Sequence, residues 1–258
     1  MNIKFYYFHT DVFVFFSYFS QKYKVNNQKE IFRHMHNEIK IISNNKIIIP
    51  TYNFSFSEKK IFDYYNDRSE VGAFSEYFRK IYKKNRTEVP IFSDTSNYNL
   101  KKIEKTINPF DKHSVFEYLN NNNGEIVTFG SDFAPTYIMY IEKNYKNGPV
   151  YRFEKKFNGI IKKKTKKKVS IKFFCRPLTI KIEYDLKKIE HDLLVEGILK
   201  QKKSESKFIY TLLNCKDFSN YAQYKLNKNP FYFLTKKNEK YLKKKIQRNG
   251  RFKQRQFE

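Results

Sequence analysis

Short apolar segments alternate with amphipathic segments through the first half of this 258-residue chain, and this alternation constrains the fold more than any other feature. The predicted strands are 3–9, 46–52 and 124–130, and the predicted helices are 27–43, 70–84, 114–120 and 131–145. The spacing of the apolar residues separates the two types, because strands repeat every two residues and helices about every 3.6. Strands that alternate with helices predict an α/β domain built around one mixed sheet.

The second half has a different pattern. Residues 149–185 alternate like paired strands, and the run KKKTKKK at 162–168 is predicted to lie at a hairpin tip. A helix at 186–199 and a strand at 207–213 follow. We therefore predict a single mixed α/β/α domain over residues 1–235 with an appended β-rich layer. Residues 236–258 are predicted to form a basic C-terminal helix or tail.

The composition allows a sizeable hydrophobic core, but it makes the net positive charge a weaker indication of nucleic-acid binding. Hydrophobic residues make up 40% of the chain and aromatic residues 19%, which argues against global disorder. The net charge of +26 would fit a nucleic-acid-binding protein. However, the chain favours Lys, Asn, Ile, Phe and Tyr, whose codons are rich in A and T, so part of the lysine excess reflects a biased genome. A basic nucleic-acid-binding protein therefore remains an alternative rather than the main hypothesis.

Cysteines and targeting signals point to a reducing compartment. Cys175 and Cys215 stand apart from each other and from any Cys or His cluster, which favours buried thiols over a disulfide or a metal site. The Phe-rich segment 5–19 is interrupted by His9 and Asp11 and has no cleavage site after it, so it does not resemble a signal peptide. No apolar run reaches the roughly 20 residues of a membrane span. We predict a cytoplasmic protein that uses no metal.

Polar residues gather where the predicted strands end and the next helices begin. Ligands of open α/β sheets bind at this edge, close to helix N-termini. The segment 131–145 is typical: Pro135 would stand near the first helical position, with Ser131 or Asp132 as the cap. Met139 in the middle of this helix can neither give nor take a proton. Either the helix has lost a catalytic base or it is an ordinary packing helix.

The order of these pieces resembles the aminoglycoside 3-N-acetyltransferase family. The chain has PTY after a strand, then SEVGAFSEYFRK, RTEVPIFS, FDKHSVFEYL, GEIVTFGSDFAPTYIMYIEKNY and finally PVYRFEKKFNG. The family pattern is similar: a His at a strand end, a Pro-Thr strand end, Ser-x-x-Gly with a later Glu, Arg-Ser/Thr-x-x-Pro-x-x-Ser, and Thr-Thr-x-x-His-x-x-Glu. The resemblance extends from about residue 5 to at least residue 160, and more loosely to about residue 235.

The resemblance implies transfer of an acetyl group from acetyl-CoA, or of another acyl group from its CoA thioester, to an amine on a sugar-like acceptor. It implies CoA-binding roles for Thr51, Ser69, Gly72, Arg86, Ser93, Ser114 and Thr136. The family's basic His falls on Met139, and a second family His falls on Val89. Another group could replace that base, namely Glu142, Asp132 or His9. Alternatively, the acceptor could need no strong base, or the chain could bind CoA or a sugar without turnover.

The charge also bears on the acceptor. Aminoglycosides are polycations, which a chain of net charge +26 would repel at long range, whereas it would attract an anion. A nucleotide-linked amino sugar, of the kind used for surface polysaccharides, is therefore the predicted acceptor. The lysine run and the basic C-terminal segment could also contact an anionic surface weakly. The sequence does not indicate an oligomeric state.

Overall fold

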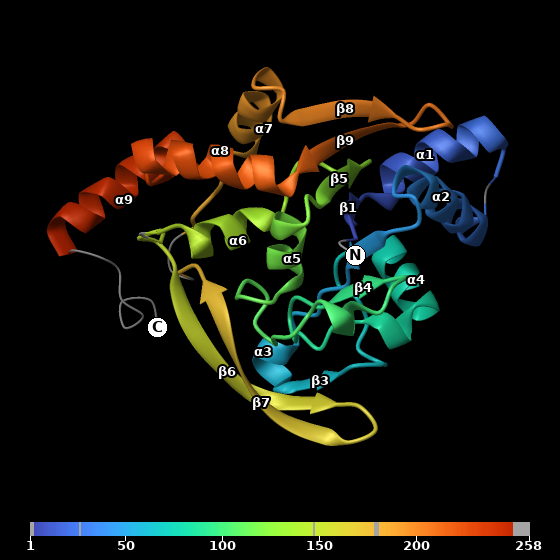
Figure 1. Cartoon of the computed structure of the whole chain (residues 1–258), viewed down its shortest axis with the longest axis horizontal. Coiled ribbons are helices and arrows are strands. Elements are labelled where there is room, and N and C mark those ends of the chain that lie inside the picture. Colours follow the sequence, from blue (N-terminus) through green and yellow to red (C-terminus); the bar gives the residue numbers. More distant parts are fainter. Residues whose placement is uncertain (1–2, 26, 147, 178–180, 250–258) are drawn as a thin grey trace.

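A computed structural model describes residues 3–25, 27–146, 148–177 and 181–249. Figure 1 shows their arrangement. The strands are β1 (Tyr6–Thr10), β2 (Ile47–Pro50), β3 (Ile61–Asp63), β4 (Asp94–Ser96), β5 (Glu125–Phe129), β6 (Phe153–Lys162), β7 (Lys166–Cys175), β8 (Leu199–Lys203) and β9 (Ile209–Asn214). The α-helices are α1 (Val12–Tyr23), α2 (Gln28–Ile42), α3 (Phe56–Lys59), α4 (Ala73–Ile81), α5 (Val115–Asn121), α6 (Tyr137–Asn144), α7 (Leu186–Val195), α8 (Cys215–Lys228) and α9 (Lys236–Asn249).

A six-stranded sheet with the order β4-β2-β1-β5-β9-β8 forms the centre of the molecule. Strand β1 is parallel to both β2 and β5, whereas β4, β9 and β8 join the sheet antiparallel. The carboxyl ends of β1, β2 and β5 therefore lie at the same edge. This is the edge at which the polar strand ends of the sequence were expected to meet.

Alternation along the strands gives the sheet two apolar faces. Tyr7 of β1 belongs to the larger core cluster, together with Ile48 and Ile126 of the neighbouring strands. The next residue, Phe8, points the other way and joins Ile49. Successive side chains leave a strand on opposite sides, so both faces of the sheet must be covered.

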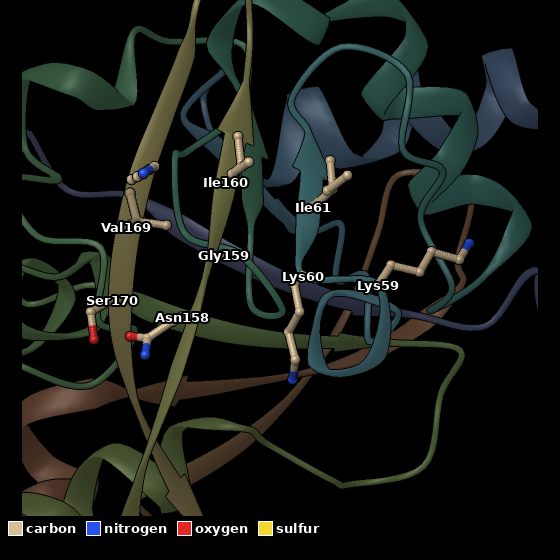
Figure 2. Close-up of a pocket in the computed structure, with 9 residues that line it drawn as sticks. Lys59, Lys60, Ile61, Asn158, Gly159, Ile160, Val169 and Ser170 are labelled. Carbon is tan, nitrogen blue, oxygen red and sulfur yellow. The ribbon is translucent and has the colours of Figure 1, made fainter.

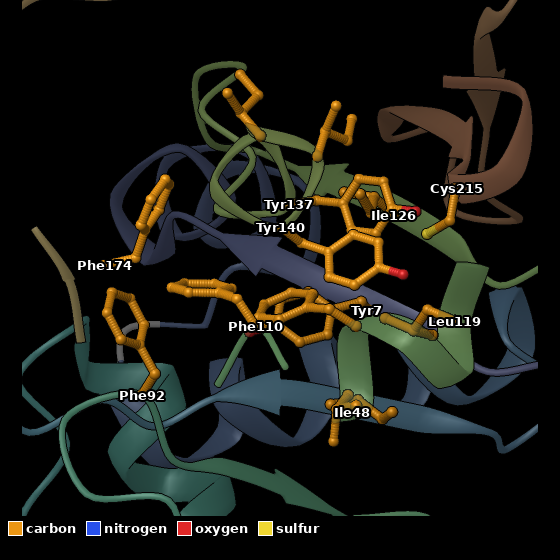
Figure 3. Packing of buried hydrophobic residues seen from close by; sticks show 14 of the residues in the cluster. Tyr7, Ile48, Phe92, Phe110, Leu119, Ile126, Tyr137, Tyr140, Phe174 and Cys215 are labelled. Carbon is orange, nitrogen blue, oxygen red and sulfur yellow. The ribbon is translucent and has the colours of Figure 1, made fainter. Parts of the chain in front are cut away.

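Helices cover the two faces. The smaller cluster brings together Phe15 and Phe19 of α1 and Met35 of α2, with Phe74 and Phe78 of α4. The larger cluster is covered by α5, α6, α7 and α8 and by the three-stranded sheet β3-β6-β7. Figure 3 shows its centre, where aromatic rings from α6 and from the loops before α5 pack over the strands. The predicted α/β/α domain with an added β layer is confirmed.

The predicted hairpin is also confirmed, since β6 and β7 pair along their whole length with the lysine run around the tip. The predicted cap of the helix at 131–145 is wrong. This helix begins only at Tyr137, and the residue before it, Thr136, makes no side-chain capping bond. Ser131 and Asp132 instead lie in the connection between β5 and α6.

The C-terminal helix α9 packs on the rest of the chain through Leu242, which is fully buried. Leu242 belongs to a small core cluster with Tyr151, Ile182, Phe231 and Leu234. The division of the chain at residue 235 stays a prediction. Cys215 is buried and Cys175 half-buried, and both are free thiols. Over the part of the chain that the structure describes, no helix is both long enough and apolar enough to cross a membrane.

Candidate functional site

A chain of contacts links the carboxyl end of β1 to the start of α6. The ring of His9 lies against that of Tyr7, with 5.4 Å between their centroids, because both side chains leave the same face of β1. The hydroxyl of Tyr7 lies 2.6 Å from that of Tyr52, which follows β2. Burial raises the pKa of Tyr52, and the nearby side chain of Thr136 acts in the opposite direction. The contacts therefore join three segments that are distant in sequence.

Asp94 at the start of β4 anchors this chain. The hydroxyl of Tyr7 donates to its Oδ1 at 2.7 Å. Burial raises the pKa of Asp94 to about 8, although the Tyr7 bond and the charge of Arg86 act in the opposite direction. A second buried carboxyl, Glu104, has its pKa raised by burial and by the nearby Asp94. The sequence reasoning missed Tyr7, Tyr52 and Asp94, although Tyr7 could have been found because it precedes His9 by two residues on a predicted strand.

Three polar side-chain atoms at this end of the sheet are buried and have no hydrogen-bond partner among the described residues: Nε2 of His9, Oγ of Ser131 and Oγ1 of Thr211. The strand register places His9 opposite Thr128, and Thr128 opposite Thr211, so these residues form a row across β1, β5 and β9. Ser131 follows the end of β5 by two residues. Unpaired buried polar atoms are rare in folded proteins, because each costs free energy, and they often mark a functional site.

The electrostatics of His9 favour a neutral imidazole. Burial lowers the pKa of His9 from 6.5 to about 4. The ring is therefore uncharged at neutral pH, and its Nε2 can either accept a proton or donate one depending on the tautomer. An uncharged imidazole with a free nitrogen is able to take a proton from a bound ligand.

Glu142, on α6, has a different environment. Its side chain is fully buried and forms an ion pair with Arg152, whose Nε donates to Oε2 at 2.6 Å. The hydroxyl of Tyr184 also donates to Oε2, at 2.6 Å, and that of Tyr151 donates to Oε1 at 2.5 Å. Both oxygens are therefore occupied by donors from the protein. This arrangement ties α6 to the segments at 151–152 and 184.

The other two residues singled out on this segment lie elsewhere. Asp132 is exposed, and its negative charge helps to raise the pKa of Glu190, after the larger effect of that residue's own burial. Met139 is half-buried and packs against the larger core cluster. The structure thus separates the three candidate bases: His9 is half-buried with a buried, unpaired Nε2, Glu142 is buried and paired, and Asp132 is exposed.

Three of the seven proposed CoA-binding residues form a buried network. Arg86 donates through Nη2 to the carbonyl oxygen of Thr51 at 2.8 Å and through Nε to the hydroxyl of Ser93 at 3.0 Å. Ser93 donates to the same carbonyl at 2.7 Å, and all three residues are fully buried. Burial lowers the pKa of Arg86 to about 10, so it stays charged at neutral pH. A fourth residue, Ser114, is also fully buried and caps α5 by accepting from the Glu117 amide at 3.2 Å.

The other three are more accessible. Thr136 is half-buried, and Ser69 is half-buried with its amide held by Oε2 of Glu76 at 2.8 Å. Gly72 precedes the first residue of α4 with φ +123°, a conformation that only glycine adopts easily. A Cβ added there would meet no atom within 4 Å, so the N-terminus of α4 is open. Among the described residues, no group of three His, Cys, Asp or Glu side chains could hold a metal ion.

Residues 43–227 match the family model of aminoglycoside 3-N-acetyltransferase. No curated protein sequence matches the chain closely enough to count as a relative.

Solved structures share the fold at low sequence identity. AAC-IIIb in a binary complex with CoASH superposes with a TM-score of 0.67 at 10% identity, over 88% of this chain and 90% of that chain. A His-to-Ala mutant of AAC(3)-IVa in complex with apramycin gives 0.63 at 12%, over 89% and 87%. The YokD protein from Bacillus subtilis gives 0.64 at 10%, over 88% of each chain. Because the family model covers most of the sequence, the chain belongs to the aminoglycoside 3-N-acetyltransferase family and is an N-acetyltransferase of that family.

Proposed function

We propose that this protein transfers an acetyl group from acetyl-CoA to the amine of a nucleotide-linked amino sugar, with His9 as the general base. The observation that carries the proposal is the buried, unpaired Nε2 of His9 at the carboxyl end of β1. Family membership supplies the reaction class, and the related AAC-IIIb was solved with CoASH. Acetyl-CoA supplies the thioester carbonyl that the amine attacks.

His9 is proposed to hold the proton that the attacking amine releases. An amine is nucleophilic only when it is neutral, and N–C bond formation makes its remaining protons acidic, so a nearby base accelerates the step. As the N–C bond forms and the C–S bond breaks, that proton passes to Nε2 and then to the departing sulfur. The hydroxyls of Ser131 and Thr211 are the proposed donors to the oxygen on which negative charge develops, because both lack a partner.

His9 is a better candidate than the two carboxylates. Glu142 already accepts from three donors of the protein, so a substrate amine would have to displace one of them. Asp132 is exposed, so a substrate amine would compete with water for its carboxylate. We assign Glu142 to the positioning of α6 and leave Asp132 as a possible contact for the acceptor.

The CoA-binding residues are proposed to act in two ways. Ser69, Gly72 and Thr136 can reach a ligand, and the open N-terminus of α4 offers backbone N–H groups to a phosphate or a carbonyl oxygen. Thr51, Arg86, Ser93 and Ser114 are buried in contacts with the protein and are proposed to hold the loops that carry the first group.

Charge supports the choice of acceptor. The net charge of +26 favours an anionic acceptor over a polycationic one. The related AAC(3)-IVa was solved with apramycin, so an aminoglycoside is the comparison that the test must include. A role in making surface polysaccharides would follow from an acceptor of this class.

Initial rates of CoA thiol release test the proposal directly. The full chain is mixed with acetyl-CoA and either a UDP-linked amino sugar or apramycin, at equal concentrations and low ionic strength. We expect a higher kcat/KM with the sugar nucleotide, and a preference that shrinks as salt is added. A higher kcat/KM with apramycin at every salt concentration would contradict the acceptor assignment.

A second candidate, binding without turnover, is favoured by the presence of Met139 where the family has its basic His. Thermal unfolding with and without acetyl-CoA separates the two. A ligand at 100 times its dissociation constant adds about 2.7 kcal/mol to the stability of the folded state. A higher Tm without thiol release from any acceptor would favour the second candidate, and an unchanged Tm would contradict both.

A further inference from the structure

Lysines face one another across the outward side of the β6–β7 hairpin. The register pairs Lys156 with Lys172, and Lys162 with Lys166. All four are exposed, whereas the residues between them, such as Phe157 and Ile171, point toward the larger core cluster. Like charges directly opposite each other destabilise a pair of strands.

The protein supplies few anions for this face. Asp63 pairs with Lys162 at 2.9 Å. Glu154, which lies on the same side of β6, is taken up by Lys143 of α6 at 2.8 Å. Among the described residues, no carboxylate forms an ion pair with Lys166, Lys168 or Lys172, so the face keeps a positive charge that the fold does not neutralise.

A groove of about 760 Å³ opens on this face (Figure 2). Lys59 and Lys60, at the end of α3, line one side, and Lys168 of β7 lines the other. The ammonium of Lys60 also donates to the carbonyl oxygen of Ser57 and lies 5.0 Å from the centroid of the Phe157 ring. Asn158 of β6 and its partner Ser170, on the same strand as Lys168, add hydrogen-bonding side chains. The remaining surface is formed by Ile61, Gly159, Ile160 and Val169. Several cationic side chains with polar side chains beside them fit an anion with more than one charged centre.

Gly159 shows that this groove is built into the fold. A Cβ at this position would lie 2.4 Å from the carbonyl oxygen of Lys60 and 2.6 Å from the ring of Phe56. Only glycine lets β6 approach this closely, and the amide of Ile160 then donates to the same carbonyl at 2.8 Å. The close approach fixes Lys59 and Lys60 beside the strand instead of leaving them on a free loop.

We propose that this groove binds the diphosphate group of a ligand. Lysine ammonium groups bind phosphate as point charges, and the amide of Asn158 and the hydroxyl of Ser170 can donate to the remaining oxygens. A single-stranded nucleic acid fits less well, because the aromatic rings of the hairpin are not free to stack on bases: Phe174 is buried, and the Phe157 ring lies under the ammonium of Lys60 at 5.0 Å. Phe173, for example, stacks on Phe92 in the interior at 5.3 Å. Protection of an edge strand would account for lysines on β7 but not for Lys59 and Lys60 on α3.

The inference deepens the proposed function. The identity of the ligand rests on that proposed function, whereas the binding of a diphosphate group to the groove does not depend on it. A sugar nucleotide and CoA both carry a diphosphate, so the shared chemistry is the same for either source. The groove would then hold the phosphates of one of the two substrates.

Calorimetric titration of the full chain with pyrophosphate, without acetyl-CoA and at low ionic strength, tests the site. We expect saturable binding that weakens at least tenfold in the double variant Lys59→Ala/Lys168→Ala. The matched control Lys200→Ala/Lys216→Ala removes the same charge from exposed positions on β8 and α8, and we expect it to change the affinity less than twofold. Equal Tm values for both variants and the parent chain show that any loss is not a loss of folding.

Equal weakening by both double variants would overturn the inference, because binding would then reflect net charge alone. An absence of saturable binding would overturn it as well, and so would tighter binding of single-stranded RNA that the groove variant leaves unchanged. Displacement of pyrophosphate by UDP-N-acetylglucosamine or by CoA supports the site and identifies its source. Since no acetyl transfer is measured, failure of this site and failure of the transferase activity are distinguishable.

Discussion

Two buried polar groups of this protein differ in how completely their hydrogen bonds are made. Glu142 on α6 accepts from Arg152, Tyr151 and Tyr184, so its charge is matched within the fold. His9 on β1 lies at the edge where parallel strands end, and its Nε2 has no partner. A fully satisfied group stabilises the structure, whereas an unsatisfied one costs stability unless something else binds it. This difference is the reason why we propose a structural role for Glu142 and a catalytic role for His9.

The largest expected effect is on catalysis and concerns His9. The substitution His9→Gln should lower kcat about 100- to 10,000-fold, because a general base contributes that much to such a step. The free energy of unfolding should change by less than about 1 kcal/mol, since Nε2 loses no hydrogen bond in the variant. Thiol release with the preferred acceptor and urea unfolding measure the two quantities. Because the pKa of His9 is about 4, the acid limb of the rate should follow the acceptor amine instead.

His36 provides a matched control for that experiment. It is also a buried histidine whose pKa is lowered by burial to about 4, but it lies on α2 on the other side of the sheet. We expect His36→Gln to leave kcat within twofold. A similar loss of activity in both variants would show that the effect of His9 is structural.

The second effect is on stability and concerns Glu142. The substitution Glu142→Ala should reduce the free energy of unfolding by about 3–5 kcal/mol, because Arg152 would keep a buried charge without a partner. The double substitution Glu142→Ala/Arg152→Met should recover part of this loss. Urea unfolding measures both. A loss below about 1 kcal/mol, or a loss of acetyl transfer with unchanged stability, would reverse the assignment of Glu142 to structure.

The third effect depends on pH and concerns Asp94. Its carboxyl accepts one hydrogen bond, from Tyr7, and so has fewer partners than Glu142 and more than Nε2 of His9. Its folded pKa of about 8 is above its unfolded value near 3.8, so the folded state binds the proton more tightly. Stability from this group is therefore full below about pH 4 and is lost as the pH rises toward 8, by an amount on the order of a few kcal/mol. In Asp94→Asn, whose carbonyl can still accept from Tyr7, the stability difference between pH 5 and pH 8 should shrink. An unchanged difference would show that another group causes it.

Much of the fold could be predicted from local patterns in the sequence. The strands at 47–50 and 125–129, the helices at 28–42 and 115–121 and the Lys-rich hairpin all lie within or close to their predicted ranges. In these segments the apolar spacing agrees with the final environment, so propensity and packing point the same way. Ser114 caps α5 as expected, because a cap depends on neighbours three residues away.

The missed elements show where local signals are weaker. Helix α1 was missed because the Phe-rich run from Val12 to Phe19 has no polar face in the sequence, and the structure indeed leaves Phe13 81% exposed. Strand β8 was missed because LKQKK at an exposed sheet edge has no apolar alternation, and α8 was missed in a segment of mixed polarity. In each case contacts with distant segments determine the structure, and a single sequence does not display them.

The sequence by itself determined the residue types of the site: a histidine at a strand end, a glycine before a helix and a carboxylate on the helix after β5. Only the tertiary structure decided which of these side chains have hydrogen-bond or ion-pair partners within the protein. The ion pair of Glu142 needs Arg152 and Tyr184, and the network around Tyr7 needs Tyr52 and Asp94 from other segments. Hydrogen-bond satisfaction is a property of three-dimensional neighbours, so the step from candidate residues to a proposed base at His9 required the fold.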